Sequence, residues 1–134
     1  MLIGAVDDWR KWALFTLAEG ARWHEGSVAL LGDAVHGMLP FAAQGAGMAI
    51  EDAAVLAKVL GETPLEPGAQ VTVALQRYER ARRGRVARVQ QLARRQGRIY
   101  HMTGAMALAR DLAIRAMGPE RVLARQAWIY DWRP

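Results

Sequence analysis

The residues best suited to chemistry lie in one glycine-bearing loop, residues 32–47. It contains Asp33 and His36, and it leads through Gly45 and Gly47 into a helical pattern. Glycines let a ligand approach the main chain, and a helix start offers unpaired N–H groups and a positive dipole end. Asp33 can accept hydrogen bonds from hydroxyl groups. These properties suit an anion or a nucleotide, and on the residues alone a simple turn capped by Asp33 is an equal alternative.

A short strand before this loop and a helix after it are expected to position these residues. Residues 27–31 form a continuous apolar run that Gly32 stops, a pattern typical of a strand buried on both faces in a parallel sheet. Residues 45–60 have apolar side chains at helical spacing, which predicts a helix that ends at Gly61. Open α/β sheets bind ligands where a strand passes into such a helix.

An arginine-rich helix is expected after a proline-containing linker at residues 62–68. Nine arginines fall between Arg77 and Arg98, and apolar residues recur three or four positions apart in the same stretch. The pattern predicts one buried face and one solvated arginine face, with Arg83-Gly84 as a candidate break. The net charge of +5 raises the alternative of a nucleic-acid surface. We favour the solvated face, the commoner meaning of a charge run, and expect no nucleic-acid partner.

The remaining segments follow from weaker patterns. Residues 9–17 are interpreted as a strand or strand end, residues 18–21 as a turn, and residues 105–117 and 119–128 as helices, with Pro119 at a first helical position. The Trp and Tyr residues near the C-terminus are expected to be core or interface anchors rather than parts of a cofactor box.

Composition excludes several classes of protein. The sequence of 134 residues contains no cysteine, so disulfides and thiolate metal sites are excluded. His24 and His101 have no ligand-like partners at metal spacing, so we expect no metal site. No apolar run approaches the length of a membrane span. Residues 1–8 contain no basic segment of a secretory signal, which favours a cytoplasmic location.

The complete loop string resembles the second flavin-contact motif of the para-hydroxybenzoate hydroxylase class of FAD-dependent aromatic-ring monooxygenases. That class has Gly-Asp-Ala-x-His, a proline four residues later, Gly-Gln-Gly, and an Asp-Ala pair on the next helix. The sequence has residues 32–36, Pro40, Gln44-Gly45 and Asp52-Ala53 at this spacing. The flanking residues 12–15, 77–82 and 130–133 are similar to the salicylate hydroxylase branch. The resemblance therefore covers nearly all of the chain.

Two positions depart from the class pattern. Ala43 stands where the class has the first glycine of Gly-Gln-Gly, and Gly47 stands where many members have asparagine. The side-chain contact of that asparagine is therefore absent, while main-chain contacts are retained. The string Ala-Gln-Gly-Ala is what the salicylate hydroxylase branch tends to show.

The resemblance implies an α/β fold: the C-terminal fragment of the FAD/NAD(P)-binding fold of flavoprotein monooxygenases, predominantly helical with a short strand feeding the flavin-contact loop. Residues 1–26 would be the end of a substrate-binding sheet and its connection, residues 27–62 the FAD-contact strand-loop-helix, and residues 63–134 a C-terminal helical region. The Gly-x-Gly-x-x-Gly motif that binds the ADP half of FAD is absent from the sequence. A truncated product, a domain fragment or a split chain, inactive alone, is therefore expected.

The resemblance also implies roles for single residues. Asp33 would bind the ribityl hydroxyls and help place the pyrophosphate, and Pro40 would sit by the reactive edge of the isoalloxazine. The amides near the helix start would face its N1–C2=O2 edge. The implied cofactor-binding residues are Gly32, Asp33, Pro40, Gln44, Gly45, Ala46 and Gly47, and those that border the substrate pocket are Met38, Leu39, Phe41 and Gln44.

No catalytic residue is assigned within these residues. By resemblance His36 fixes the loop, and the base that deprotonates a phenolic substrate lies elsewhere in the family's chain. Glu51 and Asp52 are neighbours on a helix and point about 100° apart, so we expect no convergent carboxylate pair, and Asp52 is interpreted as structural.

The implied activity is hydroxylation of an aromatic acid or phenol with FAD, NADH or NADPH, and O₂. The expected partners are a small aromatic substrate and either a homo-oligomer or the missing N-terminal chain. A flavoprotein of the same fold with another task, such as an epoxidase or a quinone-pathway hydroxylase, is an open alternative. A non-catalytic helical binding module is another.

Overall fold

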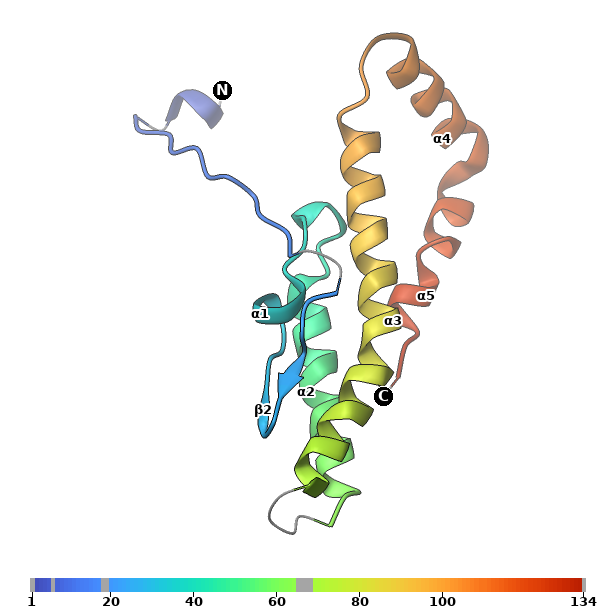
Figure 1. Cartoon of the computed structure of the whole chain (residues 1–134). Helices are drawn as coiled ribbons and strands as arrows, with labels where there is room; N and C mark the ends of the chain where they lie inside the picture. Colours follow the sequence, from blue (N-terminus) through green and yellow to red (C-terminus); the bar gives the residue numbers. More distant parts are fainter. Residues whose placement is uncertain (1, 6, 18–19, 65–68, 134) are drawn as a thin grey trace.

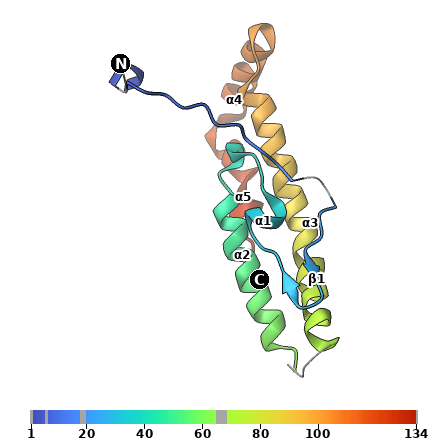
Figure 2. The same ribbon diagram turned by 60° about the vertical axis from the view of Figure 1, so that its left-hand side comes forward.

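Two long helices form the frame of the structure. The computed structural model describes residues 2–5, 7–17, 20–64 and 69–133. Helices α2 (Gly45–Gly61) and α3 (Ala69–Tyr100) lie side by side (Figures 1 and 2). The predicted helix of residues 45–60 is confirmed, and it ends at Gly61 as expected. Residues 65–68 of the predicted linker lie outside the described residues.

The core lies between these two helices and the segment that precedes them. Each helix turns one apolar face inward, because its apolar residues recur three or four positions apart. Two buried residues from the earlier segment complete the cluster. Its members are Trp23, Val35, Met48, Val55, Val59, Tyr78, Val86 and Val89.

Helix α3 is continuous, so the candidate break at Arg83-Gly84 is wrong. A glycine inside a helix costs only about 1 kcal/mol relative to alanine. Buried residues lie on both sides of Gly84, among them Tyr78 and Val86. Their packing against the core outweighs the cost of one glycine.

A two-stranded hairpin leads into the loop, and it corrects the prediction of a buried interior strand. Strands β1 (His24–Glu25) and β2 (Val28–Ala29) pair antiparallel, with His24 opposite Ala29. The strand thus covers only part of residues 27–31. Val28 is 65% exposed, because no third strand pairs with this hairpin among the described residues.

The N-terminal segment does not form the strand expected over residues 9–17. After the 3-10 helix η1 (Leu2–Ala5), residues 7–17 have no regular secondary structure and extend away from the helices (Figure 1). Trp12 and Phe15 are more than three-quarters exposed. A strand requires a neighbouring strand to bond its backbone groups, and no strand pairs with this segment in the described part of the chain, although the Leu17 amide donates to the Gly37 carbonyl at 3.3 Å. Residues 18 and 19 of the predicted turn lie outside the described residues.

The C-terminal residues return along α3. Helix α4 (Gly104–Ala124) is interrupted at Gly118, whose φ of 73° and ψ of 161° are not helical, so Pro119 begins a new helical segment as predicted. This segment ends at Ala124 rather than at residue 128. Helix α5 (Ala127–Tyr130) then lies beside the middle of α3 (Figure 1). No helix in the described ranges is long and apolar enough to cross a membrane.

Candidate functional site

Gly32 places the loop against α2. We call residues 32–44 the motif loop. Gly32 has a φ of 61°, and a Cβ at this position would lie 3.1 Å from the Cβ of Ala49 on α2. Both the positive φ and the close approach favour glycine. The amides of Val35 and His36 donate to the Gly32 carbonyl at 3.1 and 3.0 Å and form the single turn of α1 (Asp33–His36).

The start of α2 and the Asp33 carboxylate lie together, as the motif spacing predicts. A Cβ on Gly45 would be 3.7 Å from Asp33 Oδ1, and a Cβ on Gly47 would be 3.4 Å from Gln44 Oε1. No side chain caps the first turn of α2. Asp33 and Ala46 are exposed and the two glycines are half-buried, so a ligand could reach both the carboxylate and the helix amides.

The structure explains why the class has a glycine at the position that Ala43 occupies in this chain. After the short helix η2 (Pro40–Ala42), Ala43 has a φ of 51° and a ψ of 32°, and its amide donates to Pro40 O at 2.9 Å. No other non-glycine residue in the described part of the chain has a positive φ. The left-handed conformation costs an alanine about 1–2 kcal/mol. The chain thus carries local strain at the turn between Pro40 and α2.

Ala43→Gly is expected to stabilise the protein by about 1 kcal/mol, since glycine adopts the left-handed conformation without steric cost. The midpoint of urea unfolding measures the change. Ala46→Gly is the matched control. Ala46 is also exposed but lies inside α2, where glycine should lower the midpoint. A lower midpoint for Ala43→Gly would show that the turn is not strained.

A groove with arginine side chains runs between the motif loop and α3. Of the predicted substrate-pocket residues, the structure brings Leu39 and Phe41 to this groove, whereas Met38 packs against the core. A Cβ on Gly97 would lie 2.7 Å from the Phe41 ring, so this glycine makes room for the ring. The remaining residues that line the groove are Gln91, Arg94, Arg95, Arg98 and His101.

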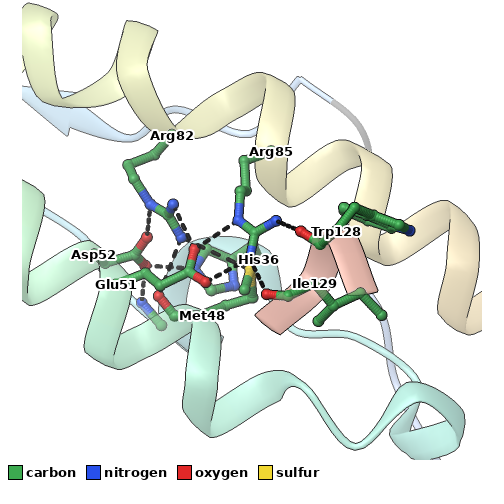
Figure 3. A network of polar contacts seen from close by, with 9 residues as sticks. His36, Met48, Glu51, Asp52, Arg82, Arg85, Trp128 and Ile129 are labelled. Carbon is green, nitrogen blue, oxygen red and sulfur yellow. Dashed lines mark hydrogen bonds and ion pairs between the residues drawn. The ribbon is translucent and has the colours of Figure 1, made fainter. Parts of the chain in front are cut away.

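Asp52 anchors the motif loop to α2 through hydrogen bonds. Its side chain is fully buried. Its Oδ2 atom accepts hydrogen bonds from the Gly32 amide at 3.0 Å and from His36 Nε2 at 2.5 Å (Figure 3). Its Oδ1 atom accepts one from Arg82 Nε at 2.8 Å. Gln90 on α3 also donates to the His36 carbonyl at 3.3 Å. The geometry agrees with a loop-fixing role for His36 and a structural role for Asp52.

A chain of ion pairs extends from Asp52 to the C-terminal residues. Arg82 Nη1 lies 2.7 Å from Glu51 Oε2. Arg85 binds the same carboxylate with two nitrogens, at 2.9 and 2.6 Å, and donates to the carbonyls of Trp128 and Ile129 at 3.2 and 2.7 Å (Figure 3). We call Glu51, Asp52, Arg82 and Arg85 the buried ion network.

This network corrects two predictions. Glu51 and Asp52 do converge, because the Arg82 guanidinium reaches both carboxylates with different nitrogens. The arginine face of α3 is not all solvated, because the Arg82 side chain is fully buried and that of Arg85 is only 9% exposed. A signal for Arg82 exists in the sequence: it stands four positions after Tyr78 and four before Val86, on the apolar face of the helix.

The network sets the protonation of two buried groups. Burial raises the pKa of the Asp52 carboxyl, but hydrogen bonds from His36, Arg82 and the Gly32 amide outweigh it, so the pKa lies below its ordinary value. Burial, and then the Asp52 charge, raise the pKa of the Tyr78 phenol. The phenol donates a hydrogen bond to the Leu30 carbonyl at 3.1 Å.

The histidines outside the motif loop have protein contacts rather than metal-like surroundings. His24 Nε2 lies 3.4 Å from Glu79, and His101 Nδ1 lies 2.7 Å from the Gly97 carbonyl. The described residues contain no group of three or more His, Cys, Asp or Glu side chains placed to hold a metal ion. Near the C-terminus, Trp128 and Trp132 pack against the core, as expected for anchors, while Tyr130 is exposed.

One protein family matches the chain over residues 7–93, the family described as FAD binding domain. The match includes the hairpin, the motif loop, α2 and most of α3.

Several curated relatives match nearly the whole chain. A 3-amino-4-hydroxybenzoate 2-monooxygenase, PtmB3 of Streptomyces platensis, is 42% identical over 98% of the chain and 32% of its own length. A 3-hydroxybenzoate 6-hydroxylase of Polaromonas naphthalenivorans (strain CJ2) is 36% identical over 98% of the chain and 32% of its own length. A salicylate hydroxylase of Pseudomonas putida is 37% identical over 90% of the chain and 26% of its own length. The chain thus spans about a third of the length of these relatives.

Proposed function

Because the chain belongs to the FAD-binding domain family, we propose that it forms the flavin side of the FAD site in a monooxygenase that hydroxylates an aromatic acid or phenol. The family match and the names of the relatives confirm the resemblance inferred from the motif loop. The observation that supports the site most directly is the Asp33 carboxylate beside the uncapped, glycine-bearing start of α2.

The residues at this place fit the cofactor. A flavin nucleotide has ribityl hydroxyls that a carboxylate can bind and a ring edge that becomes negative on reduction. The exposed Asp33 offers the acceptor, and the amides at the start of α2 offer donors in the field of a 17-residue helix. The absence of a Cβ at Gly45 and Gly47 leaves these amides open to a planar ligand. The proposed cofactor contacts are Gly32, Asp33, Pro40, Gln44, Gly45, Ala46 and Gly47.

Each group then has a separate task. Asp33 holds the ribityl chain, and the preorganised amides of residues 45–47 stabilise negative charge at the N1–C2=O2 edge. Pro40 borders the reactive edge of the ring and helps to exclude water. Gln44 orients a polar substituent of the substrate, in a pocket bordered by Leu39 and Phe41. When bound and reduced by NADH or NADPH, FAD supplies the activation of O₂.

The other parts of the activity would depend on residues that this chain does not contain. The adenine and pyrophosphate sites, and the base for a phenolic substrate, would come from the two-thirds of the relatives' length that the chain does not match. A cytoplasmic location is part of the proposal, since the reductant is a nicotinamide nucleotide. The comparisons do not favour a non-catalytic binding module, because the three relatives above are named as hydroxylases or monooxygenases.

A chimaera tests this function. The chain replaces the matching third of the Streptomyces platensis enzyme, to which it is 42% identical. We expect NADH or NADPH oxidation that depends on an aromatic acid and yields a hydroxylated product. The control is the same chimaera carrying Asp111→Ala, a change at an exposed position on α4. A folded chimaera that binds flavin but forms no hydroxylated product with any benzoate tested would contradict the assignment as a hydroxylase.

A further inference from the structure

The C-terminal residues are linked to the motif loop by continuous polar contacts. The link begins at the carbonyls of Trp128 and Ile129, which accept hydrogen bonds from Arg85. It continues through Glu51 and Arg82 to Asp52. Asp52 in turn binds the Gly32 amide and His36. Figure 3 shows the side chains of α2 and α3 pointing toward one another, with the main-chain carbonyls of α5 beside Arg85.

Tryptophan side chains cover this link from the C-terminal side. The Trp132 ring lies 4.8 Å from the Arg82 guanidinium carbon and 5.2 Å from that of Arg85. The Trp128 ring lies 3.8 Å from that of Arg88. Cation–π contacts of this kind favour a docked C-terminal segment. Because the rings also exclude water, the ion pairs beneath them are stronger and more sensitive to displacement than surface pairs.

The geometry has one consequence for the loop. Arg85 can bind Glu51 and the carbonyls of Trp128 and Ile129 at the same time only while α5 is docked. Glu51 in turn shares Arg82 with Asp52, so its position affects the guanidinium that orients Asp52. Loss of the C-terminal contacts would therefore change the hydrogen bonds at Gly32, where the motif loop begins.

We propose that Glu51, Arg82 and Arg85 are positioning residues through which the C-terminal segment, residues 126–133, sets the geometry of the motif loop and hence its affinity for FAD. The proposal rests on the proposed function only for the identity of the ligand. None of the three residues is among the proposed cofactor contacts. Each acts through Asp52, and the docked C-terminal segment is required for the loop to be preorganised.

The test compares two arginines of α3 in the chimaera with the Streptomyces platensis enzyme. Arg85→Met removes the buried link. Arg77→Met removes the exposed pair with Glu62, 2.7 Å apart, just after the C-terminal end of α2, and serves as the matched control. Hydrogen exchange of peptides covering residues 32–37, without flavin, reports on the loop, and titration with FAD reports on binding.

For Arg85→Met we expect exchange of the loop peptides to rise and FAD affinity to fall, each by roughly two- to thirtyfold, a usual range for coupling through packed networks. Exchange in the middle of α3 should stay unchanged. Arg85→Lys, which keeps the charge but not the two-nitrogen contact, should lie between wild type and Arg85→Met. Truncation after Arg125 should reproduce the loop effect and add little to Arg85→Met.

Several results would overturn the proposal. Equal effects of Arg85→Met and Arg77→Met would do so, as would a rise in exchange across all helices, which would mean a general loss of stability. If Arg85→Met fails to fold, unchanged loop exchange in Arg85→Lys and in the truncated protein would overturn it. Failure of the chimaera without substitutions to bind FAD would instead contradict the proposed function, while the loop exchange would still test the network.

Discussion

Asp52→Ala is expected to remove about 3–5 kcal/mol of the free energy of unfolding, the usual cost of leaving a buried charge without its partner. The substitution leaves the buried Arg82 guanidinium, the His36 ring and the Gly32 amide without their shared acceptor. Domains of this size have total stabilities of about 5–15 kcal/mol, so much of the fold would be lost. Urea unfolding followed by tryptophan fluorescence measures the change. A loss below about 1 kcal/mol would contradict the central structural role of Asp52.

Asp52→Asn separates the charge of Asp52 from its shape. The pKa of Asp52 is lowered in the folded protein. Its charge therefore contributes stability above its unfolded pKa of about 3.9, and this contribution is lost as the pH falls through the lower folded pKa. The stability difference between wild type and Asp52→Asn should be constant at neutral pH and shrink below about pH 4. A constant difference down to the most acidic conditions would contradict this assignment.

Asp33→Ala is expected to weaken FAD binding by roughly ten- to a hundredfold, since hydrogen bonds to a charged acceptor contribute about 1.5–3 kcal/mol. Stability should hardly change, because Asp33 is exposed. Asp52→Ala should show the opposite pattern, with its main loss in stability. Titration of the chimaera with FAD gives the affinity, and Asp111→Ala is the control.

The outcome for Asp33→Ala separates two readings of the motif loop. If Asp33 binds the ribityl hydroxyls, affinity falls while the unfolding midpoint stays near that of wild type. If Asp33 only caps a turn, the midpoint falls and the affinity per folded molecule is unchanged. The second result would favour the alternative in which the loop is a simple turn capped by Asp33.

Local patterns in the sequence predicted the helical part of the site well. The apolar spacing of residues 45–60 and the terminal Gly61 mark α2 correctly. The motif spacing also brings Asp33 to Gly45. Both features depend on residues close in sequence, so helix periodicity and loop length are sufficient to predict them.

The strands and the buried arginines could not be predicted in the same way. The apolar run at residues 27–31 suggests a buried strand, yet Val28 is exposed because burial depends on partner strands, which no local pattern supplies. The place of Arg82 on the apolar face of α3 indicates burial, but its partners Asp52 and Glu51 lie 30 and 31 positions away, and no local pattern identifies them. Such pairing is a long-range property of the fold.

The most direct test of the account is whether flavin is retained through gel filtration. The chimaera should retain stoichiometric FAD, seen in its visible absorbance, because this chain supplies the isoalloxazine side and the rest of the host supplies the ADP side. The 134-residue chain alone should elute colourless, since a dinucleotide draws its affinity from both halves. A folded chimaera without flavin would contradict the claim that these residues complete an FAD site. If the isolated chain retained flavin and eluted yellow, these residues would bind FAD without the part that binds its ADP half.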